Sequence, residues 1–149
     1  MIRSAALLCL FCLAPLPAFT DDKDDPGKKD RDAMQGDWAC ESMTRDGMAF
    51  PDDDAQALFR TVKGDTYVVS RYRNKAGSGT FTLDASKSPK QIDVVPDGPK
   101  KVVIEGIYKV EKDVLTMCIA APGAKRPTAF SSTEGSGHTL TVWKKEMKK

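Results

Sequence analysis

The sequence has little of the side-chain chemistry that enzymes and metal sites use. It contains one histidine, His138, and four cysteines among its 149 residues. A Ser-His-Asp hydrolase needs a histidine base, and zinc sites usually take three or four Cys, His or carboxylate ligands. His138 follows Gly137 at the start of an expected strand, where hydrogen bonding at the strand edge is its simpler role. We therefore predict a protein that is not an enzyme and uses no cofactor or metal.

Other functional motifs are also missing. Gly77-Ser78-Gly79 and Gly135-Ser136-Gly137 are not followed by Lys-Ser/Thr and a helix, so neither is a phosphate-binding loop. Asp52-Asp53-Asp54 lacks the alternating ligand spacing of an EF-hand and is more typical of a helix start. Asp93 and Glu105 are interpreted as solvated surface charge rather than as a catalytic carboxylate pair. The formal net charge of +2 gives no electrostatic case for nucleic-acid binding.

Long hydrophobic runs are absent after the N-terminal segment. Met1-Ile2-Arg3 carries one positive charge, Ala5 to Leu16 is apolar, and small residues precede a charged stretch that begins at Asp21. This is the pattern of a cleavable signal peptide, which we place at residues 1–20, with an uncleaved anchor as the alternative. The apolar run is shorter than the roughly 20 residues that a membrane-spanning helix needs. We expect export to the periplasm or the extracellular space, with no stable membrane insertion.

Residues 21–33 are charged, contain Pro26-Gly27 and have no large apolar side chain. Such a segment buries too little surface to become ordered by itself. We therefore predict a flexible charged linker at residues 21–33 and one folded domain at residues 34–147.

The expected domain consists of short strands separated by turn residues. Runs of β-branched and aromatic residues alternate with turn signals about every ten residues, which indicates an all-β barrel or sandwich of about eight strands. Asp52 begins a short helix after the first strand. The expected strands are Gly36–Met43, Phe59–Lys63, Thr66–Tyr72, Thr80–Leu83, Gln91–Val95, Lys101–Val110, Val114–Ala120 and His138–Lys145.

Two cysteines remain once the expected signal peptide is removed. Cys40 and Cys118 form an even count in a compartment where disulfides persist. We predict a Cys40–Cys118 disulfide, with two separately buried thiols as the alternative.

Several motifs resemble a known family. Gly36-x-Trp38 is similar to the lipocalin signature, in which the tryptophan closes one end of an eight-stranded barrel. Further matches follow in order and together resemble the uncharacterised lipocalin-like domain that is abundant in exported planctomycete proteins. They are Leu83-Asp84-x-Ser86-x-Ser88-Pro89-Lys90-x-Ile92-Asp93, Gly106-Ile107-Tyr108, Leu115-x-Met117-Cys118-x-Ala120, Arg126-Pro127-Thr128-x-Phe130 and Gly135-Ser136-Gly137-His138.

The resemblance spans Met34 to Lys145 and implies an exported, lipocalin-like, antiparallel up-and-down β-barrel with no known activity. Cys118 matches a common cysteine of that family, whereas Cys40 stands where an aliphatic residue is more usual. This departure means that the predicted disulfide is not implied by the family.

A small barrel either fills its interior with side chains or holds one ligand. We predict non-enzymatic binding of a small apolar or amphipathic ligand that enters near the short helix around Asp52–Leu58. The alternative is a solid-cored protein-interaction or structural module of the cell envelope. The candidate pocket residues are Trp38, Tyr67, Arg71, Phe81, Leu83, Tyr108 and Met117.

Overall fold

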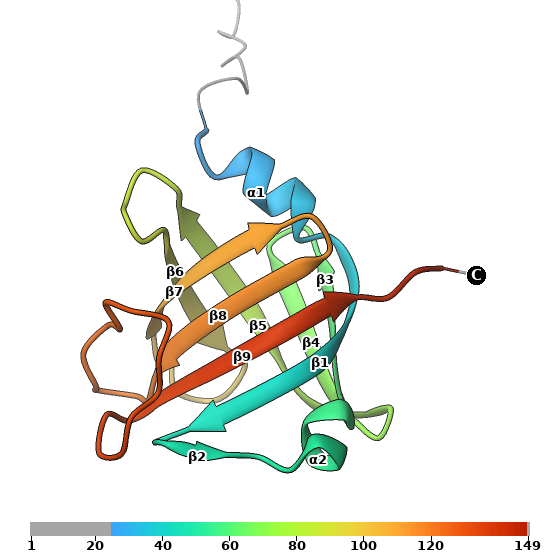
Figure 1. Ribbon diagram of the computed structural model, residues 1–149. Helices are drawn as coiled ribbons and strands as arrows, with labels where there is room; N and C mark the ends of the chain where they lie inside the picture. Colours follow the sequence, from blue (N-terminus) through green and yellow to red (C-terminus); the bar gives the residue numbers. More distant parts are fainter. Residues whose placement is uncertain (1–24, 149) are drawn as a thin grey trace, which may run out of the picture.

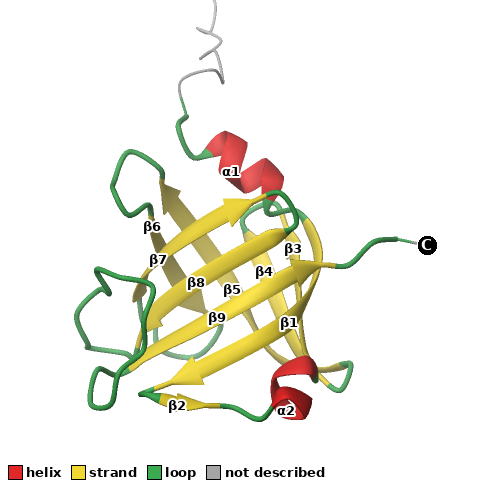
Figure 2. Ribbon diagram, viewed as in Figure 1, coloured by secondary structure: helices red, strands yellow, loops and turns green. Residues whose placement is uncertain are grey.

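The computed structural model describes residues 25–148, so the predicted signal peptide at residues 1–20 lies outside the described part. Residues 25–148 contain eight long strands in a closed antiparallel barrel, one very short strand and two short helices (Figures 1 and 2). The strands are β1 (Gly36–Arg45), β2 (Met48–Ala49), β3 (Leu58–Lys63), β4 (Thr66–Arg71), β5 (Asn74–Asp84), β6 (Gln91–Pro96), β7 (Ile104–Glu111), β8 (Val114–Ala120) and β9 (His138–Lys145).

The barrel closes because β1 pairs on both of its edges. From β3 to β9 each strand is antiparallel to the next, and β1 pairs with β3 on one side and with β9 on the other. The β1–β9 register runs from Trp38 opposite Lys145 to Arg45 opposite Thr139, with an irregularity between Cys40 and Ser42. The expected lipocalin-like, antiparallel up-and-down β-barrel is therefore confirmed.

Alternation along the strands places one set of side chains inside. Met117 on β8 lies inside between Tyr108 of β7 and Thr141 of β9, its register partners. The interior half nearer the start of β1 is tightly filled, and Trp38 there has no exposed surface. The buried residues of this packed half include Trp38, Val62, Phe81, Ile92, Tyr108 and Leu115.

Two strands begin several residues away from the start that the sequence indicates. β5 starts at Asn74 rather than Thr80, because the turn before it closes at Tyr72 and Arg73, both with positive φ. Gly79 thus lies inside a strand, where a Cβ would collide with the carbonyl oxygen of Val95. β7 starts at Ile104 rather than Lys101.

The expected short helix after the first strand is present as α2 (Asp52–Gln56). Three aspartates occupy its first turn, where negative charge suits the helix dipole, although Pro51 precedes the helix and no side chain caps it. Asp54 forms an ion pair with Arg71 at 2.7 Å, and the Tyr72 amide donates to the Ala57 carbonyl at 2.8 Å. These contacts hold α2 beside the turn between β4 and β5.

The prediction of a flexible linker at residues 21–33 is wrong for its C-terminal part. Residues 28–33 form helix α1 (Lys28–Ala33), which lies across the end of the barrel where β1 begins (Figure 1). Asp30 is only 7 % exposed, and its Oδ2 accepts hydrogen bonds from Lys90 Nζ at 2.7 Å and Tyr108 Oη at 2.8 Å. The segment is thus ordered by a buried polar contact, which an argument from apolar content misses.

The chain after α1 is also fixed to the barrel. Trp38 Nε1 donates to the Met34 carbonyl at 2.8 Å, and Lys145 Nζ donates to the Ala33 carbonyl at 3.2 Å. Gln35 Oε1 accepts from the Gly64 amide at 2.7 Å, and its Nε2 donates to the Gly64 carbonyl at 3.0 Å. These bonds make α1 the cover of one barrel end, which we call the closed end.

The predicted Cys40–Cys118 disulfide is wrong, because both cysteines are free and buried. Cys40 belongs to the barrel core on β1, whereas Cys118 on β8 lies between inward-facing Met117 and Ile119 and therefore faces outward. Strand β9 also lies between β1 and β8. The Cys40 Sγ lies 3.4 Å from the Ser42 carbonyl and the Cys118 Sγ 3.3 Å from the Ser131 carbonyl, so each thiol has its own partner.

Removing the Asp30 carboxylate should destabilise the fold. Asp30→Ala leaves the buried Tyr108 hydroxyl without its acceptor, which should lower the free energy of unfolding by about 2 kcal/mol. Asp32→Ala, on the same helix but with an exposed carboxylate, should change it by less than about 0.5 kcal/mol. Urea denaturation measures both, and equal effects of the two variants would contradict this account of α1.

Both thiols should react slowly in the folded protein. Burial raises the pKa of Cys40 to about 11 and also raises the pKa of Cys118, so little thiolate exists near pH 8. Alkylation with iodoacetamide, mapped by peptide mass spectrometry, should be slow before denaturation and complete afterwards. Detection of a disulfide-linked peptide pair that contains Cys40 and Cys118 would contradict the finding that both thiols are free.

Candidate ligand cavity

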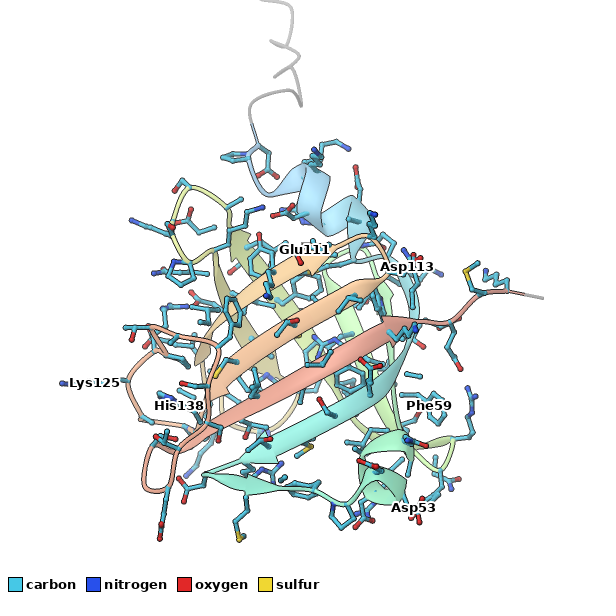
Figure 3. All side chains as sticks on the ribbon, viewed as in Figure 1. Asp53, Phe59, Glu111, Asp113, Lys125 and His138 are labelled. Atoms are coloured by element: carbon cyan, nitrogen blue, oxygen red, sulfur yellow. The ribbon has the colours of Figure 1, made fainter. Side chains whose placement is uncertain are left out.

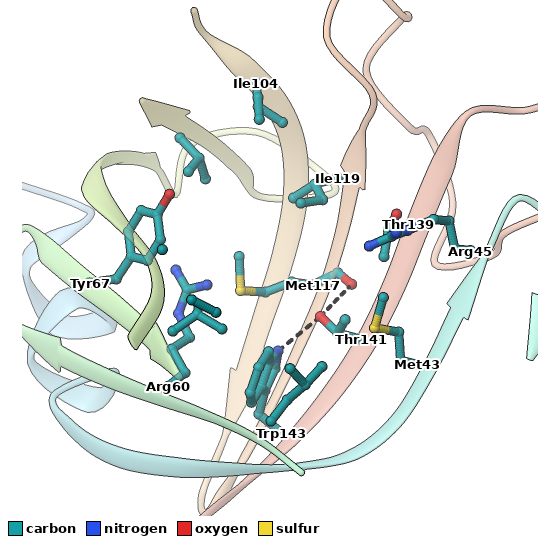
Figure 4. Close-up of a pocket in the computed structure, with 15 residues that line it drawn as sticks. Met43, Arg45, Arg60, Tyr67, Ile104, Met117, Ile119, Thr139, Thr141 and Trp143 are labelled. Atoms are coloured by element: carbon teal, nitrogen blue, oxygen red, sulfur yellow. Dashed lines mark hydrogen bonds between the residues drawn. The ribbon is translucent and has the colours of Figure 1, made fainter. Parts of the chain in front are cut away.

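The half of the barrel away from α1 is hollow. It holds a cavity of about 320 Å³ with mostly apolar walls, to which all eight long strands contribute (Figure 4). This volume is at the lower end of the range of small-molecule pockets. Apolar lining residues are Met43, Leu58, Val69, Val94, Ile104, Met117 and Ile119.

The hollow exists because one wall carries almost no side chains. Gly77 and Gly79 face Val69 and Tyr67 across the β4–β5 ladder, at inward positions of β5. The side chain of Tyr67 occupies the space beside Gly79, because a Cβ on Gly79 would lie 2.9 Å from the Tyr67 phenol oxygen. Nothing lies within 4 Å of a Cβ placed on Gly77, so this part of the wall stays open.

Two polar side chains of the wall satisfy each other. Trp143 Nε1 donates to Thr141 Oγ1 at 2.8 Å, and that hydroxyl lies 3.5 Å from the Met117 carbonyl (Figure 4). These groups therefore add little free hydrogen-bonding capacity to the cavity.

Arg60 on β3 is the exceptional residue of the wall. It is 7 % exposed, and its guanidinium carbon lies 4.4 Å from the centre of the Tyr67 ring (Figure 4). Among residues 25–148, no carboxylate lies within ion-pair distance of this guanidinium, and the buried Nε has no hydrogen-bond partner. Burial lowers the pKa of Arg60 to about 10, so the side chain is still a cation at neutral pH.

The cavity continues toward the end of the barrel opposite α1, which we call the open end. A second hollow of about 390 Å³ adjoins it and shares four of its lining residues. A smaller hollow of about 150 Å³ lies beside α2 and is lined by Phe50, Asp54 and Arg71. Arg45, at the end of β1, contributes to all three hollows. The four shared residues are Arg45, Ile104, Ile119 and Thr139.

The structure divides the seven pocket residues predicted from the sequence. Tyr67 and Met117 line the cavity, and Arg71 lines the small hollow beside α2. The other four lie toward the closed end, where Trp38, Phe81 and Tyr108 are buried in the packed half and Leu83 packs against it.

Sequence reasoning missed Arg60 and the glycines of β5. Arg60 stands between Leu58 and Val62 in an alternating run, so the period of two placed it on the inward face, and this was an available signal. Gly77 and Gly79 also share that period, but their composition resembles a loop. In this barrel, the inward strand positions beside the cavity include an arginine and glycines instead of large apolar residues.

A cluster of charged side chains lies on the outside of the barrel, where Asp93 of β6 faces Glu105 of β7. Arg126 binds both carboxylates, with Nη2 at 2.6 Å from Asp93 Oδ1 and 3.1 Å from Glu105 Oε1. Its Nη1 donates to the carbonyls of Ile92 at 3.1 Å and Gly106 at 2.8 Å. The two carboxylates are thus partly exposed but paired, and the cluster fastens the loop between β8 and β9 to the barrel.

His138 lies in the same region, at the start of β9. Its Nε2 is 3.1 Å from the carbonyl oxygen of Lys125 in the loop before it (Figure 3). Within residues 25–148 no three His, Cys, Asp or Glu side chains are grouped so that they could hold a metal ion.

Neither of the helices described for residues 25–148 has the length and apolar character needed to cross a membrane.

Comparison with known proteins identifies a family but no activity. Residues 18–142 match the family described as "Domain of unknown function (DUF5004)". No curated protein and no solved structure matches the chain. The lipocalin-like family of exported planctomycete proteins, which the sequence resembles, stays a prediction.

Replacing Arg126 should loosen the loop between β8 and β9. Arg126→Met removes two ion pairs and two hydrogen bonds to carbonyls from a side chain that is 19 % exposed. The free energy of unfolding should fall by about 2 kcal/mol. Lys125→Met, at the exposed neighbouring position, is the matched control and should change stability little. Indistinguishable urea midpoints for the two variants would refute this role of Arg126.

Proposed function

The chain belongs to the DUF5004 family, whose function is unknown, and we propose that it is a non-enzymatic binding protein for a small apolar or amphipathic molecule. The ligand occupies the cavity in the hollow half of the barrel. The observation that carries the proposal is the apolar cavity of about 320 Å³ in a barrel whose other half is fully packed.

The driving force is removal of apolar surface from water. Burial contributes roughly 25 cal/mol for each Å² of apolar surface, and the walls of this cavity are mainly aliphatic and sulfur-containing side chains. The walls belong to paired strands of a closed barrel, so the site is formed before the ligand arrives. Little conformational entropy is then lost on binding.

The ligand enters at the open end, next to α2. The hollows that adjoin the cavity lie at this end, whereas α1 covers the other. The short helix is held by the exposed Asp54–Arg71 ion pair, by the hydrogen bond from the Tyr72 amide to the Ala57 carbonyl and by the buried Ala55. We include in the proposal that α2 acts as a lid and that the protein works outside the cytoplasm, as its N-terminal sequence suggests.

A variant that fills the cavity tests the proposal. Ile119 lines both the cavity and the adjoining hollow, so Ile119→Trp should obstruct the cavity and weaken binding at least about tenfold. The probe is N-phenyl-1-naphthylamine, a neutral dye whose fluorescence rises in apolar surroundings. Val114→Trp adds the same side chain at an outward, exposed position of the same strand and should bind the dye like the original protein.

Extraction of the purified protein followed by mass spectrometry looks for a ligand acquired during expression. Failure of the original protein to bind the dye, with no extracted molecule, would overturn the proposal. The protein-interaction or structural module would then become the better hypothesis.

A further inference from the structure

Arg60 places an uncompensated positive charge in the wall of the apolar cavity. Taking a cation out of water costs several kcal/mol unless an opposite charge or hydrogen bonds replace the water. For Arg60, the only charge-related contact within residues 25–148 is the face of Tyr67, and a cation–π contact recovers a small part of that cost. Within the described part of the chain the guanidinium therefore has no charged partner, and its N–H donors face an apolar cavity.

We propose that Arg60 binds the carboxylate head group of an amphipathic monoanion whose apolar tail extends through the cavity toward the open end. This inference rests on the function proposed above and specifies its ligand class. A planar guanidinium presents paired N–H donors that match the two oxygens of a carboxylate, and such charge-assisted bonds strengthen when water is excluded.

The position of Arg60 orients the ligand. Arg60 pairs with Trp38 of β1 and Val69 of β4, so it lies at the boundary between the packed half and the hollow half. The apolar wall continues from there through Ile104 and Ile119 to the open end (Figure 4). A ligand that reaches Arg60 with its head must therefore place its tail along this wall.

The cavity also limits the size of the ligand. Its volume of about 320 Å³ is at the lower end of the range of small-molecule pockets, so the ligand is small. A medium-chain fatty acid is of this size, and the tail of a longer one would extend into the adjoining hollow between Arg45 and Thr139.

The experiment compares decanoate with 1-decanol, two molecules with the same tail but different head groups. Both are measured by displacement of N-phenyl-1-naphthylamine from the original protein, Arg60→Met and Arg31→Met. Arg31 lies on α1 at the closed end, so its variant has the same charge change away from the cavity. Decanoate should bind the original protein and Arg31→Met at least about tenfold more tightly than decanol.

Arg60→Met should lose this preference. Its affinity for decanoate should fall at least about tenfold, whereas its affinity for decanol should change less than about threefold. Its melting temperature without ligand should equal or exceed that of the original protein, because a buried, unpaired charge is replaced by an apolar side chain of similar length. This second measurement separates a lost head-group contact from a damaged fold.

The possible failures are distinguishable. Equal affinities for decanoate and decanol in the original protein, or unchanged decanoate binding in Arg60→Met, would overturn the head-group inference and leave the proposed function standing. If neither the dye nor decanol binds, the proposed function fails and the inference fails with it.

Discussion

The pairing of β1 with β9 is the constraint on which the rest of the structure depends. It joins the first and last long strands of the described chain, so that each of the eight long strands has a neighbour on both sides. A closed ring has no free edge and forces inward side chains to share one limited volume. The packed half, the cavity and the position of Arg60 all follow from how that volume is filled.

The volume is filled unequally along the barrel axis. Toward the closed end, large side chains such as Trp38 and Tyr108 meet and are covered by α1, whose Asp30 anchors it to the barrel. Toward the open end, glycine replaces side chains on β5 and leaves space beside Arg60. The most tightly packed side chains and the space for a ligand thus lie toward opposite ends of one barrel.

The sequence was sufficient for the fold because alternation and turns are local signals that every strand carries. The sequence also correctly predicted that Tyr67 and Met117 line the cavity. It was insufficient for α1, whose order depends on a contact between Asp30 and residues far along the chain. The prediction of a Cys40–Cys118 disulfide was wrong because pairing also depends on residues far apart in the chain. An even number of cysteines does not show which face of the sheet each thiol occupies. The buried Arg60 contradicts the usual sorting of charge to the surface, and such exceptions concentrate at functional sites.

Closure between β1 and β9 also determines the order of events during synthesis. A chain made from its N-terminus has β1 available before any other described strand, but its second partner, β9, is the last of the described strands to be made. Until then both edge strands of the growing sheet expose unpaired amides and carbonyls, with which other chains can pair. This exposure ends only when β9, the last of the described strands, pairs with β1.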